Sequence, residues 1–313
     1  MEAGTQTQGT TPGGWTPLGV KRRRWGEEII RALLFLAAAI SVLTTLGIIV
    51  ALLADSIPFF QEVGTRFFTD GSWGPLFGDA QFGIWQLLNG TFLITGIAIL
   101  VAVPLGLGAA VYLSEYASPR VRKVVKPILE VLVGVPTVVF GYFALAFVTP
   151  ELLKPLGIHV ASFNALSAGL VMGIMIVPTI ASISEDSMRA VPMGLREGAY
   201  GMGATRRQVA TRVVFPAAIS GIVASIVLGV SRGVGETMIV LLAAGLQPNF
   251  GINPTEGYAT ITTFMGATAD GDNPAGSIGY ESIFACGLIL FVLTLIMNVI
   301  AIRFVRKYRQ VYE

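Results

Sequence analysis

Six apolar stretches, each long enough to cross a lipid bilayer, constrain this chain more than any other feature. The hydrocarbon core of a bilayer is about 30 Å thick, so a helix needs roughly 20 consecutive apolar residues to cross it. Apolar residues make up 53% of the 313 residues and charged residues only 13%, which excludes a water-soluble globule. We therefore expect an all-α integral membrane protein with six transmembrane helices. Their approximate ranges are Ile29–Ala54, Trp85–Leu113, Pro127–Val148, Ala165–Ile183, Ala217–Leu246 and Ile283–Phe304.

The positions of the basic residues predict how these helices are oriented. Of the 21 Lys and Arg residues, 18 lie on one side: before the first helix, between the second and third, between the fourth and fifth, and after the sixth. Only Arg66 and Lys154 lie on the other side, and Arg232 lies within the fifth stretch. Because cytoplasmic loops carry the excess of Lys and Arg, both termini are expected in the cytoplasm. The run Lys21–Arg24 is then a topology anchor, and no nucleic acid is expected as a partner.

The same pattern predicts how the chain is divided. The expected segments are a disordered basic cytoplasmic tail (1–28), the first transmembrane helix (29–54), an external loop (55–83), a core of five helices (84–306) that contains a long cytoplasmic loop (184–216), and a second cytoplasmic tail (307–313). The external loop is rich in aromatic residues, which could anchor it at the membrane interface or form a docking surface for an external partner. These residues are Phe59, Phe60, Phe67, Phe68 and Trp73.

Residues that would support catalysis are scarce. One histidine, His159, and one cysteine, Cys286, leave no cluster for a metal or for nucleophilic catalysis. A phosphate-binding loop for ATP needs a lysine followed by Ser or Thr, and none of the five lysines has this neighbour. We therefore expect a non-catalytic chain that binds no cofactor itself.

The cytoplasmic loop 184–216 has a local structure of its own. Val191-Pro192 predicts a break after the fourth helix, since the residue before proline is pushed out of the helical region. A short helix over residues 195–202 can end at Gly203 in the left-handed conformation. Thr205, with Gln208 three residues later, forms a capping-box pattern that starts a second helix over residues 206–214. A solvated connector, a DNA-reading element and a docking element for a cytoplasmic partner are all compatible with this pattern.

A motif in this loop favours docking. Glu197-Gly198-Ala199, followed by Gly203 and by Phe215-Pro216, resembles the EAA motif of ABC-importer permeases in its spacing. Gly198 stands where the family usually has alanine, and Phe215 where it usually has leucine. The resemblance implies that the short helix lies in a cleft of an ATPase subunit and transmits its movement to the membrane helices. The implied coupling residues are Glu197, Gly198, Ala199, Gly203 and Pro216.

Two charged residues, Arg232 and Glu236, interrupt the fifth apolar stretch. An arginine at the centre of a membrane helix costs roughly 2.5–3.5 kcal/mol, so such residues usually face the interior of a bundle. Their spacing of four predicts that they share a helix face and can pair. Small residues recur every four positions beside them and predict close packing against another helix. The pair is either an internal salt bridge or a site for an oxyanion, which the guanidinium fork suits.

Further motifs narrow the resemblance to the C-type permease subunits of phosphate ABC importers. The motifs are Val103–Ala110 with Ser114–Tyr116, Lys126–Glu130 with Gly134–Gly141, Val177–Asp186 with Arg189–Pro192, and Gly235–Met238. The resemblance implies a type I ABC-importer (MetI-like) permease fold in a bacterial inner membrane. The implied partners are an A-type permease subunit, two ATP-binding subunits that use ATP-Mg, and an external phosphate-binding protein.

The same resemblance implies a transport role for Arg232 and Glu236. A permease for another oxyanion, such as molybdate or sulfate, remains an alternative, because electrostatics alone does not separate tetrahedral anions. A secondary transporter or channel is the alternative from a different class, although the paired repeats with broken helices that are typical of such transporters are not evident.

Overall fold

The structure is a computed structural model that describes residues 25–75, 80–271, 274 and 276–308. The chain divides into two compact units, Met1–Val50 and Ala51–Glu313. Helix α1 (Trp25–Val63) begins in the first unit and continues into the second, past its expected end at Ala54. Of the predicted disordered tail 1–28, residues 1–24 lie outside the described residues, and residues 25–28 belong to α1. The predicted tail 307–313 lies outside them from residue 309 onward.

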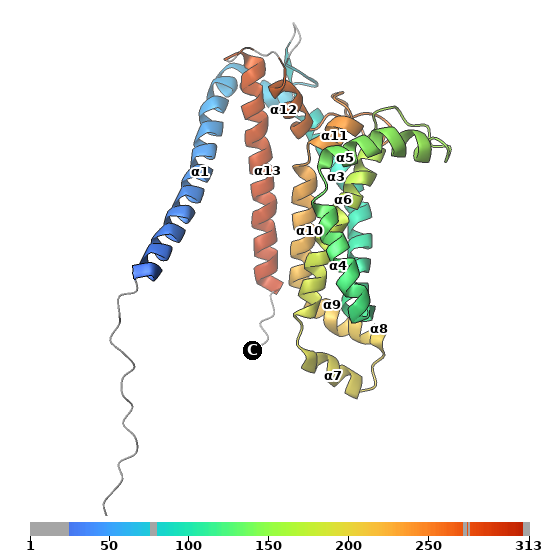
Figure 1. Ribbon diagram of the computed structural model, residues 1–313. Coiled ribbons are helices and arrows are strands. Elements are labelled where there is room, and N and C mark those ends of the chain that lie inside the picture. The colour runs from blue at the N-terminus through green and yellow to red at the C-terminus, as the bar shows by residue number, and fades with distance from the viewer. Residues whose placement is uncertain (1–24, 76–79, 272–273, 275, 309–313) are drawn as a thin grey trace, which may run out of the picture. The chain divides into compact units, whose positions relative to one another are not determined.

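The described part of the second unit is mostly helical, with one small antiparallel sheet (Figure 1). After α1 the elements are α2 (Arg66–Thr69), β1 (Trp73–Gly74), β2 (Gln81–Phe82), α3 (Trp85–Val111), the π-helical turn η1 (Tyr112–Tyr116), α4 (Pro119–Val133), α5 (Thr137–Phe143), η2 (Ala144–Leu153), α6 (Ala165–Arg189), α7 (Met193–Gly201), α8 (Arg206–Val209), η3 (Ala210–Val214), α9 (Phe215–Ala217), α10 (Ile219–Val234), α11 (Met238–Ala243), α12 (Ile261–Ala269) and α13 (Ile278–Tyr308).

Within the described residues, four helices are individually long and apolar enough to cross a membrane, namely α1, α3 with η1, α6 and α13. Two further candidates are bent pairs: α4 with α5 and η2, and α8 to α9 with α10. Counting each bent pair as one span gives six, the number that the apolar stretches predict.

Helix α6 is the centre of the bundle and packs against α3, α10, α4 and α11. Glycines make its contact with α3 close. A Cβ on Gly173 would lie 2.8 Å from the carbonyl oxygen of Ala98, and one on Gly169 would lie 2.6 Å from the side chain of Ile97. Small residues allow the backbones of membrane helices to approach in this way and so gain van der Waals contact. This packing gives α6, from which several of the candidate functional side chains project, a fixed position.

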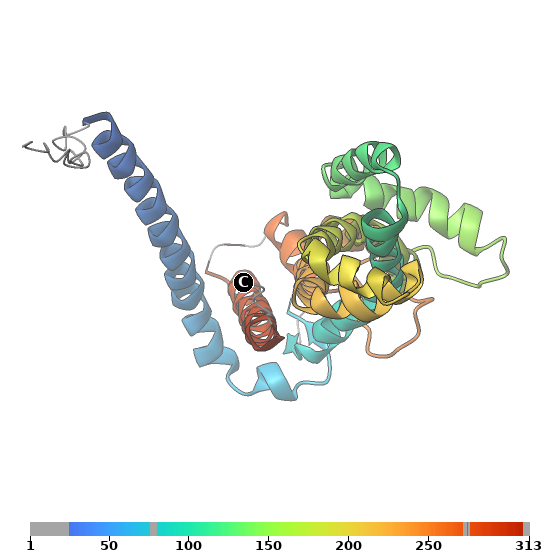
Figure 2. The same cartoon turned by 90° about the horizontal axis from the view of Figure 1, so that it is seen from below.

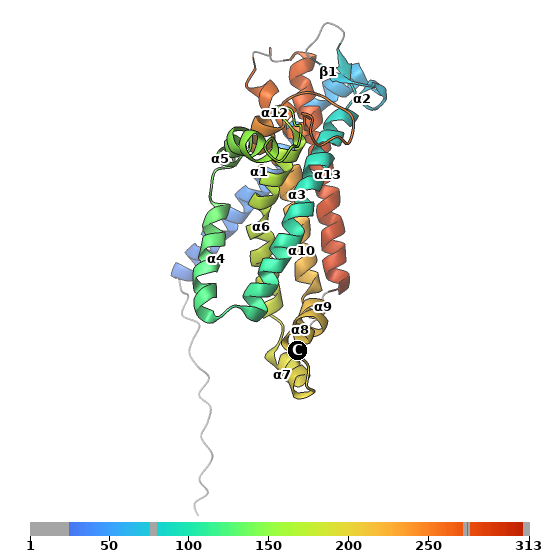
Figure 3. The ribbon, with the colours of Figure 1, turned by 90° about the vertical axis from the view of Figure 1, so that its right-hand side faces the viewer.

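The third predicted helix, Pro127–Val148, is not one continuous helix. It begins earlier, as α4 at Pro119, and breaks after Val133; the two parts enclose an angle of 89° (Figure 3). The break contains Gly134, Val135 and Pro136, where the proline ring excludes the helical conformation of the preceding residue and removes a backbone donor. A kink at Pro136 is what a proline inside an apolar stretch predicts, and the structure confirms it.

At the end of the bundle opposite α7, the aromatic residues form a core. Phe59, Phe67, Trp73 and Phe82 are buried and contact one another edge to face, with ring centroids 5.3–6.3 Å apart along the chain of contacts. Strand β1 supports this core by pairing Trp73 with Phe82. These buried rings are therefore neither interface anchors nor a docking surface, because they pack against one another and against Ile261 and Phe264 of α12, whereas Phe68 is 50% exposed. Figure 1 shows the small sheet and α12 at this end of the bundle.

Candidate functional site

The loop that carries the EAA-like motif folds as two short helices joined by a tight turn. Helix α7 ends in a Schellman motif: the N–H of Gly203 donates to the carbonyl of Tyr200 at 2.9 Å, and the N–H of Ala204 donates to that of Ala199 at 3.1 Å. Gly203 has φ +84°, the left-handed conformation predicted for it. Helix α8 then begins at the predicted capping box of Thr205 and Gln208. Seen from below, α7 and α8 cross the end of the bundle (Figure 2).

The EAA-like residues divide into one buried and several exposed positions. Ala199 is buried and packs in a cluster with Met188, Val209 and Val214, so it fixes α7 to the end of α6 and to the second helix of the loop. Glu197, Gly198, Gly203 and, on α9, Pro216 are exposed. Among the described residues, the Glu197 carboxylate has no ion-pair or hydrogen-bond partner, so its charge is available to another molecule.

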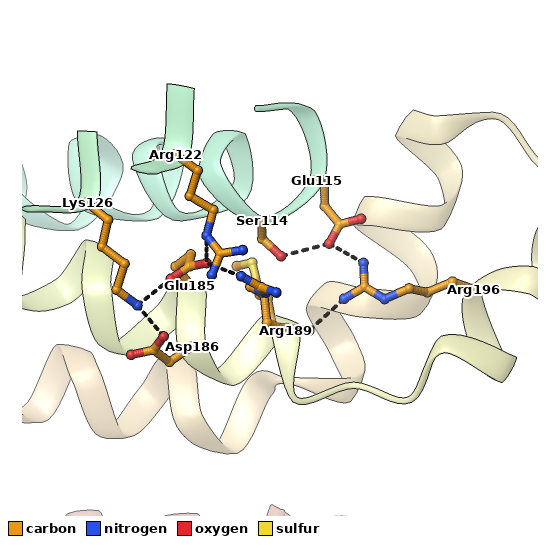
Figure 4. Close-up of polar contacts among 9 residues, drawn as sticks. Ser114, Glu115, Arg122, Lys126, Glu185, Asp186, Arg189 and Arg196 are labelled. Atoms are coloured by element: carbon orange, nitrogen blue, oxygen red, sulfur yellow. Dashed lines mark hydrogen bonds and ion pairs between the residues drawn. The ribbon is translucent and has the colours of Figure 1, made fainter. Parts of the chain in front are cut away.

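A dense group of ion pairs joins this loop to the membrane helices (Figure 4). We call it the charged cluster; its residues are Glu115, Arg122, Lys126, Glu185, Asp186, Arg189 and Arg196. At its loop end, Arg196 Nη1 of α7 lies 2.6 Å from Glu115 Oε1 of η1, and Arg196 Nη2 donates to the carbonyl of Met188 at 2.8 Å. The side chains of Glu115 and Arg196 are only 4% and 13% exposed. The start of α7 is thereby tied both to the end of α3 and to α6.

Glu185 is the centre of the other half of the charged cluster. Its side chain is 1% exposed and lies 2.9 Å from Arg122 Nε and 2.9 Å from Lys126 Nζ, both on α4. Arg189, one turn later on α6, lies 3.9 Å away, and Asp186 makes a second contact to Lys126. A buried carboxylate is costly without cationic partners, and here the partners come from α4 and from α6 itself. Glu185 therefore holds α4 to α6.

Sequence reasoning did not assign a role to Glu115, Glu185 or Arg196. In the sequence, Ser114–Tyr116 and Val177–Asp186 indicate only a family resemblance. A local rule could not have paired them, because Glu115 and Arg196 are 81 residues apart and Lys126 and Glu185 are 59 apart. The sequence does show an acidic residue at the end of each of these apolar stretches. Such a residue needs a cationic partner, but only the tertiary structure identifies that partner.

The contact between α6 and α10 is the second candidate region, and we call it the seam. It is formed by the predicted row of small residues on α10. Gly229 packs against Ile176 and Ile180, and Ser225 Oγ lies 2.7 Å from Ser184 Oγ in a buried hydrogen bond. The prediction that this row packs closely against another helix is confirmed.

Arg232 and Glu236 are not a pair. Arg232 Nη1 donates to Thr179 Oγ1 of α6 at 3.3 Å, and no ion pair joins it to Glu236 in the part of the chain described here. The prediction of a shared helix face was wrong because α10 ends at Val234 with Gly235 as its C-cap, so Glu236 lies outside the helix. A spacing of four residues places side chains on one face only while the helix continues.

Glu236 instead lies just before the next helix, α11. Its Oε1 atom accepts hydrogen bonds from the N–H groups of Met238 and Ile239, at 3.1 and 3.3 Å, in the first turn of α11. A carboxylate at a helix N-terminus is favourable because it satisfies free N–H groups and faces the positive end of the helix dipole. Thr262 of α12 donates to the Glu236 carbonyl at 2.7 Å. Glu236 thus fixes the break that follows Arg232.

This arrangement leaves the Arg232 guanidinium largely uncommitted. Within the described residues it makes one long hydrogen bond and no ion pair, although it carries five N–H donors. A half-buried cation with free donors beside a break in a membrane helix can bind an anion through two parallel hydrogen bonds.

Residues 102–310 match the family model described as "Binding-protein-dependent transport system inner membrane component". The chain is 35% identical over 285 residues to the phosphate transport system permease protein PstC of Mesorhizobium japonicum, covering 85% of this chain and 86% of that protein.

Two solved structures share the fold. A chain of a bacterial alginate ABC transporter, solved with an alginate pentasaccharide-bound periplasmic protein, has a TM-score of 0.63 at 18% identity; the match covers 93% of this chain and 100% of that one. A chain of the inward-facing MetNI methionine ABC transporter has a TM-score of 0.54 at 20% identity and covers 73% of this chain and 95% of that one. The expected MetI-like permease fold is confirmed.

Proposed function

The chain belongs to the family of binding-protein-dependent transport system inner membrane components and is a multi-pass permease of an ABC importer, and from this premise we propose that its substrate is inorganic phosphate. We assign it as the C-type subunit that forms half of the translocation pathway in a bacterial inner membrane. An A-type permease subunit would supply the other half. Both termini and the α7–α8 loop would lie on the cytoplasmic side, where the excess of basic residues places them.

The assignment of phosphate as the substrate rests on the relatives. The Mesorhizobium japonicum protein at 35% identity and the Haemophilus influenzae protein at 29% identity, over 85% and 91% of this chain, are both named phosphate transport system permease protein PstC. The uncommitted guanidinium of Arg232 supports an anionic substrate, since a planar fork of donors binds the oxygens of a tetrahedral oxyanion.

In the proposed pathway Arg232 attracts the anion, and Glu236 acts by fixing the local structure. Because Glu236 accepts hydrogen bonds from the first N–H groups of α11, it would hold the start of α11 beside the end of α10, which carries Arg232. Thr179, which accepts from Arg232, would hold the guanidinium in place when no anion is bound. A switching counter-charge role for Glu236 would require the break between α10 and α11 to change during transport.

The chain itself is proposed to be non-catalytic, with ATP-Mg used by two ATP-binding subunits. Glu197, Gly198, Gly203 and Pro216 form the exposed side of the α7–α8 loop and would contact one of these subunits, while buried Ala199 would carry the movement to α6. The ion pair of Arg196 with Glu115 would carry it to α3. An external phosphate-binding protein would deliver the substrate on the opposite side.

Reconstitution tests this proposal directly. The complex, purified from its native membrane and placed in liposomes with binding protein outside and ATP inside, should take up radiolabelled phosphate. Excess unlabelled phosphate should compete, and sulfate or molybdate should not. Competition by sulfate or molybdate would assign a different oxyanion. Uptake that persists without ATP, together with the absence of a co-purifying ATPase, would identify a secondary transporter instead.

A further inference from the structure

A cavity of about 910 Å³ at the loop end of the bundle is lined by a basic surface to which the transport proposal assigns no ligand. It lies between the end of α3, the charged face of α4 and the connection from α6 to α7. Five basic side chains line it, against the single acidic residue Glu130. The basic residues are Arg122, Lys123, Lys126, Arg189 and Arg196.

The acidic partners of these residues do not line the cavity. Glu185 and Glu115 are 1% and 4% exposed, and Figure 4 shows Glu185 enclosed by Lys126, Arg122 and Arg189. Asp186, the exposed partner of Lys126, is also absent from the lining, so a negatively charged molecule in the cavity would meet mainly donors. Such a surface attracts anions even though the cluster as a whole is close to neutral.

Several donors around the cavity are free. Arg122 uses Nε toward Glu185 and makes no hydrogen bond through its terminal nitrogens to any described residue. Arg189 has only a 3.9 Å contact, and Lys123 is exposed with no hydrogen bond or ion pair to the rest of the described chain. Three cations with unused N–H groups around one cavity provide the charge-assisted hydrogen bonds that a phosphate group accepts.

The surface of α4 beside the cavity indicates which kind of molecule carries the phosphate group that these donors suit. Lys123, Pro127 and Glu130 line the cavity at positions i, i+4 and i+7, which is one face of a helix. The next residues, Val124, Ile128 and Val131, form the neighbouring face and are 60%, 54% and 71% exposed. A molecule that places a phosphate in the cavity can therefore lay hydrocarbon along this apolar face.

We propose that the cavity binds the headgroup of an anionic phospholipid, with its acyl chains along Val124, Ile128 and Val131. Lys123, Arg122 and Arg189 contact the phosphate. Glu130 accepts a hydrogen bond from a headgroup hydroxyl, such as those of phosphatidylglycerol. Basic pockets between membrane helices at the cytoplasmic surface bind lipids of this charge. The cytoplasmic position of the loop end of the bundle rests on the topology in the proposed function. The lipid contact rests only on the basic lining of the cavity and on the apolar face of α4.

Lipid retention on the whole transporter complex tests the proposal. The purified complex is equilibrated with phosphatidylglycerol or with phosphatidylcholine of the same chain length, and the lipid that it retains is measured by native mass spectrometry. We expect preferential retention of phosphatidylglycerol. The double variant K123Q/R189Q should retain it roughly 30-fold more weakly, because each basic residue near an anionic lipid contributes about a fivefold effect.

A matched double variant, R120Q/R303Q, removes two exposed charges that do not line the cavity and should retain the lipid as the unmodified complex does. Equal losses in both double variants, or equal retention of the two lipids, would overturn the proposal. Displacement of the lipid by millimolar inorganic phosphate would assign the cavity to a soluble phosphate compound instead. Binding in detergent does not depend on topology or on transport, so failure here is distinguishable from failure of the phosphate-importer proposal.

Discussion

The charged cluster and the seam both place arginine next to α6, but they use it differently. In the charged cluster, Arg196 lies 2.6 Å from a carboxylate and donates to a backbone carbonyl. In the seam, Arg232 makes one 3.3 Å hydrogen bond to a hydroxyl. A buried guanidinium that is fully paired stabilises one arrangement of helices, and one that is nearly unpaired remains available to a ligand. The difference separates a structural connection from a candidate binding residue.

The largest effect on stability is expected from breaking the charged cluster at Glu115. Replacing Glu115 with Gln leaves the Arg196 guanidinium buried without its counter-charge, which costs about 3–5 kcal/mol. The thermal unfolding midpoint of the purified complex should fall accordingly. Arg120→Gln, which removes an exposed charge on the nearby α4, should leave the midpoint unchanged. The exchange Glu115→Arg with Arg196→Glu should restore part of the loss, and a midpoint that Glu115→Gln does not alter would show that the ion pair is not structural.

Replacing Arg232 with Gln should affect transport and leave assembly intact. A charge-assisted hydrogen bond contributes about 1.5–3 kcal/mol, so ATP-driven phosphate uptake should fall roughly 10- to 100-fold. Because Arg232 has no ion pair among the described residues, the unfolding midpoint should change little. Arg232→Lys keeps the charge but loses the planar fork and should give an intermediate rate. Normal uptake by Arg232→Gln would exclude the binding role.

The turn beside the charged cluster offers a smaller test of coupling. Gly203 has φ +84°, so Gly203→Val imposes a strain of about 1–2 kcal/mol on the turn that follows α7. ATPase subunits should co-purify less with this variant. Gly201→Ala is the matched control, since Gly201 is helical and has open space for a methyl group. Full co-purification with full transport in Gly203→Val would contradict docking through this loop.

The smallest effect is expected in the seam itself. Ser225→Ala removes the hydrogen bond to Ser184, and such bonds between membrane helices contribute about 0.6 kcal/mol. Ser225 Oγ also donates to the carbonyl of Ile222 at 2.7 Å, so Ser225→Ala should cost slightly more than Ser184→Ala. The double variant Ser184→Ala with Ser225→Ala should cost about the same as Ser225→Ala alone, because the two changes remove the same bond between the helices. The free energies of unfolding of the single and double variants measure this coupling. A strictly additive double variant would mean that the two hydroxyls act independently.

Much of the α7–α8 loop could be predicted because its signals are local. A glycine after a short helix and a Thr with Gln three residues later specify the turn and the second helix through their own backbone hydrogen bonds. The small-residue row on α10 likewise predicted a close helix contact, since its periodicity depends only on the helix itself.

One error arose where a single residue interrupts a regular pattern. Gly235 ends α10 inside an apolar stretch, and the hydropathy of the sequence does not reveal such a break, whereas the kink at Pro136 was predictable from the proline itself. The pairing of Arg232 with Glu236 failed for this reason. The ion pairs of Glu115 and Glu185 were missed because their partners are distant in the sequence.

The sequence by itself determined that this is a helical membrane protein, how many times it can cross the bilayer, and which loop carries the EAA-like motif, because these follow from local apolarity and spacing. Only the tertiary structure decided which charges are neutralised. The free energy of a buried charge depends on the atoms within a few ångströms of it. Those atoms come from helices that the chain brings together only when it folds, and they leave Arg196 paired and Arg232 available.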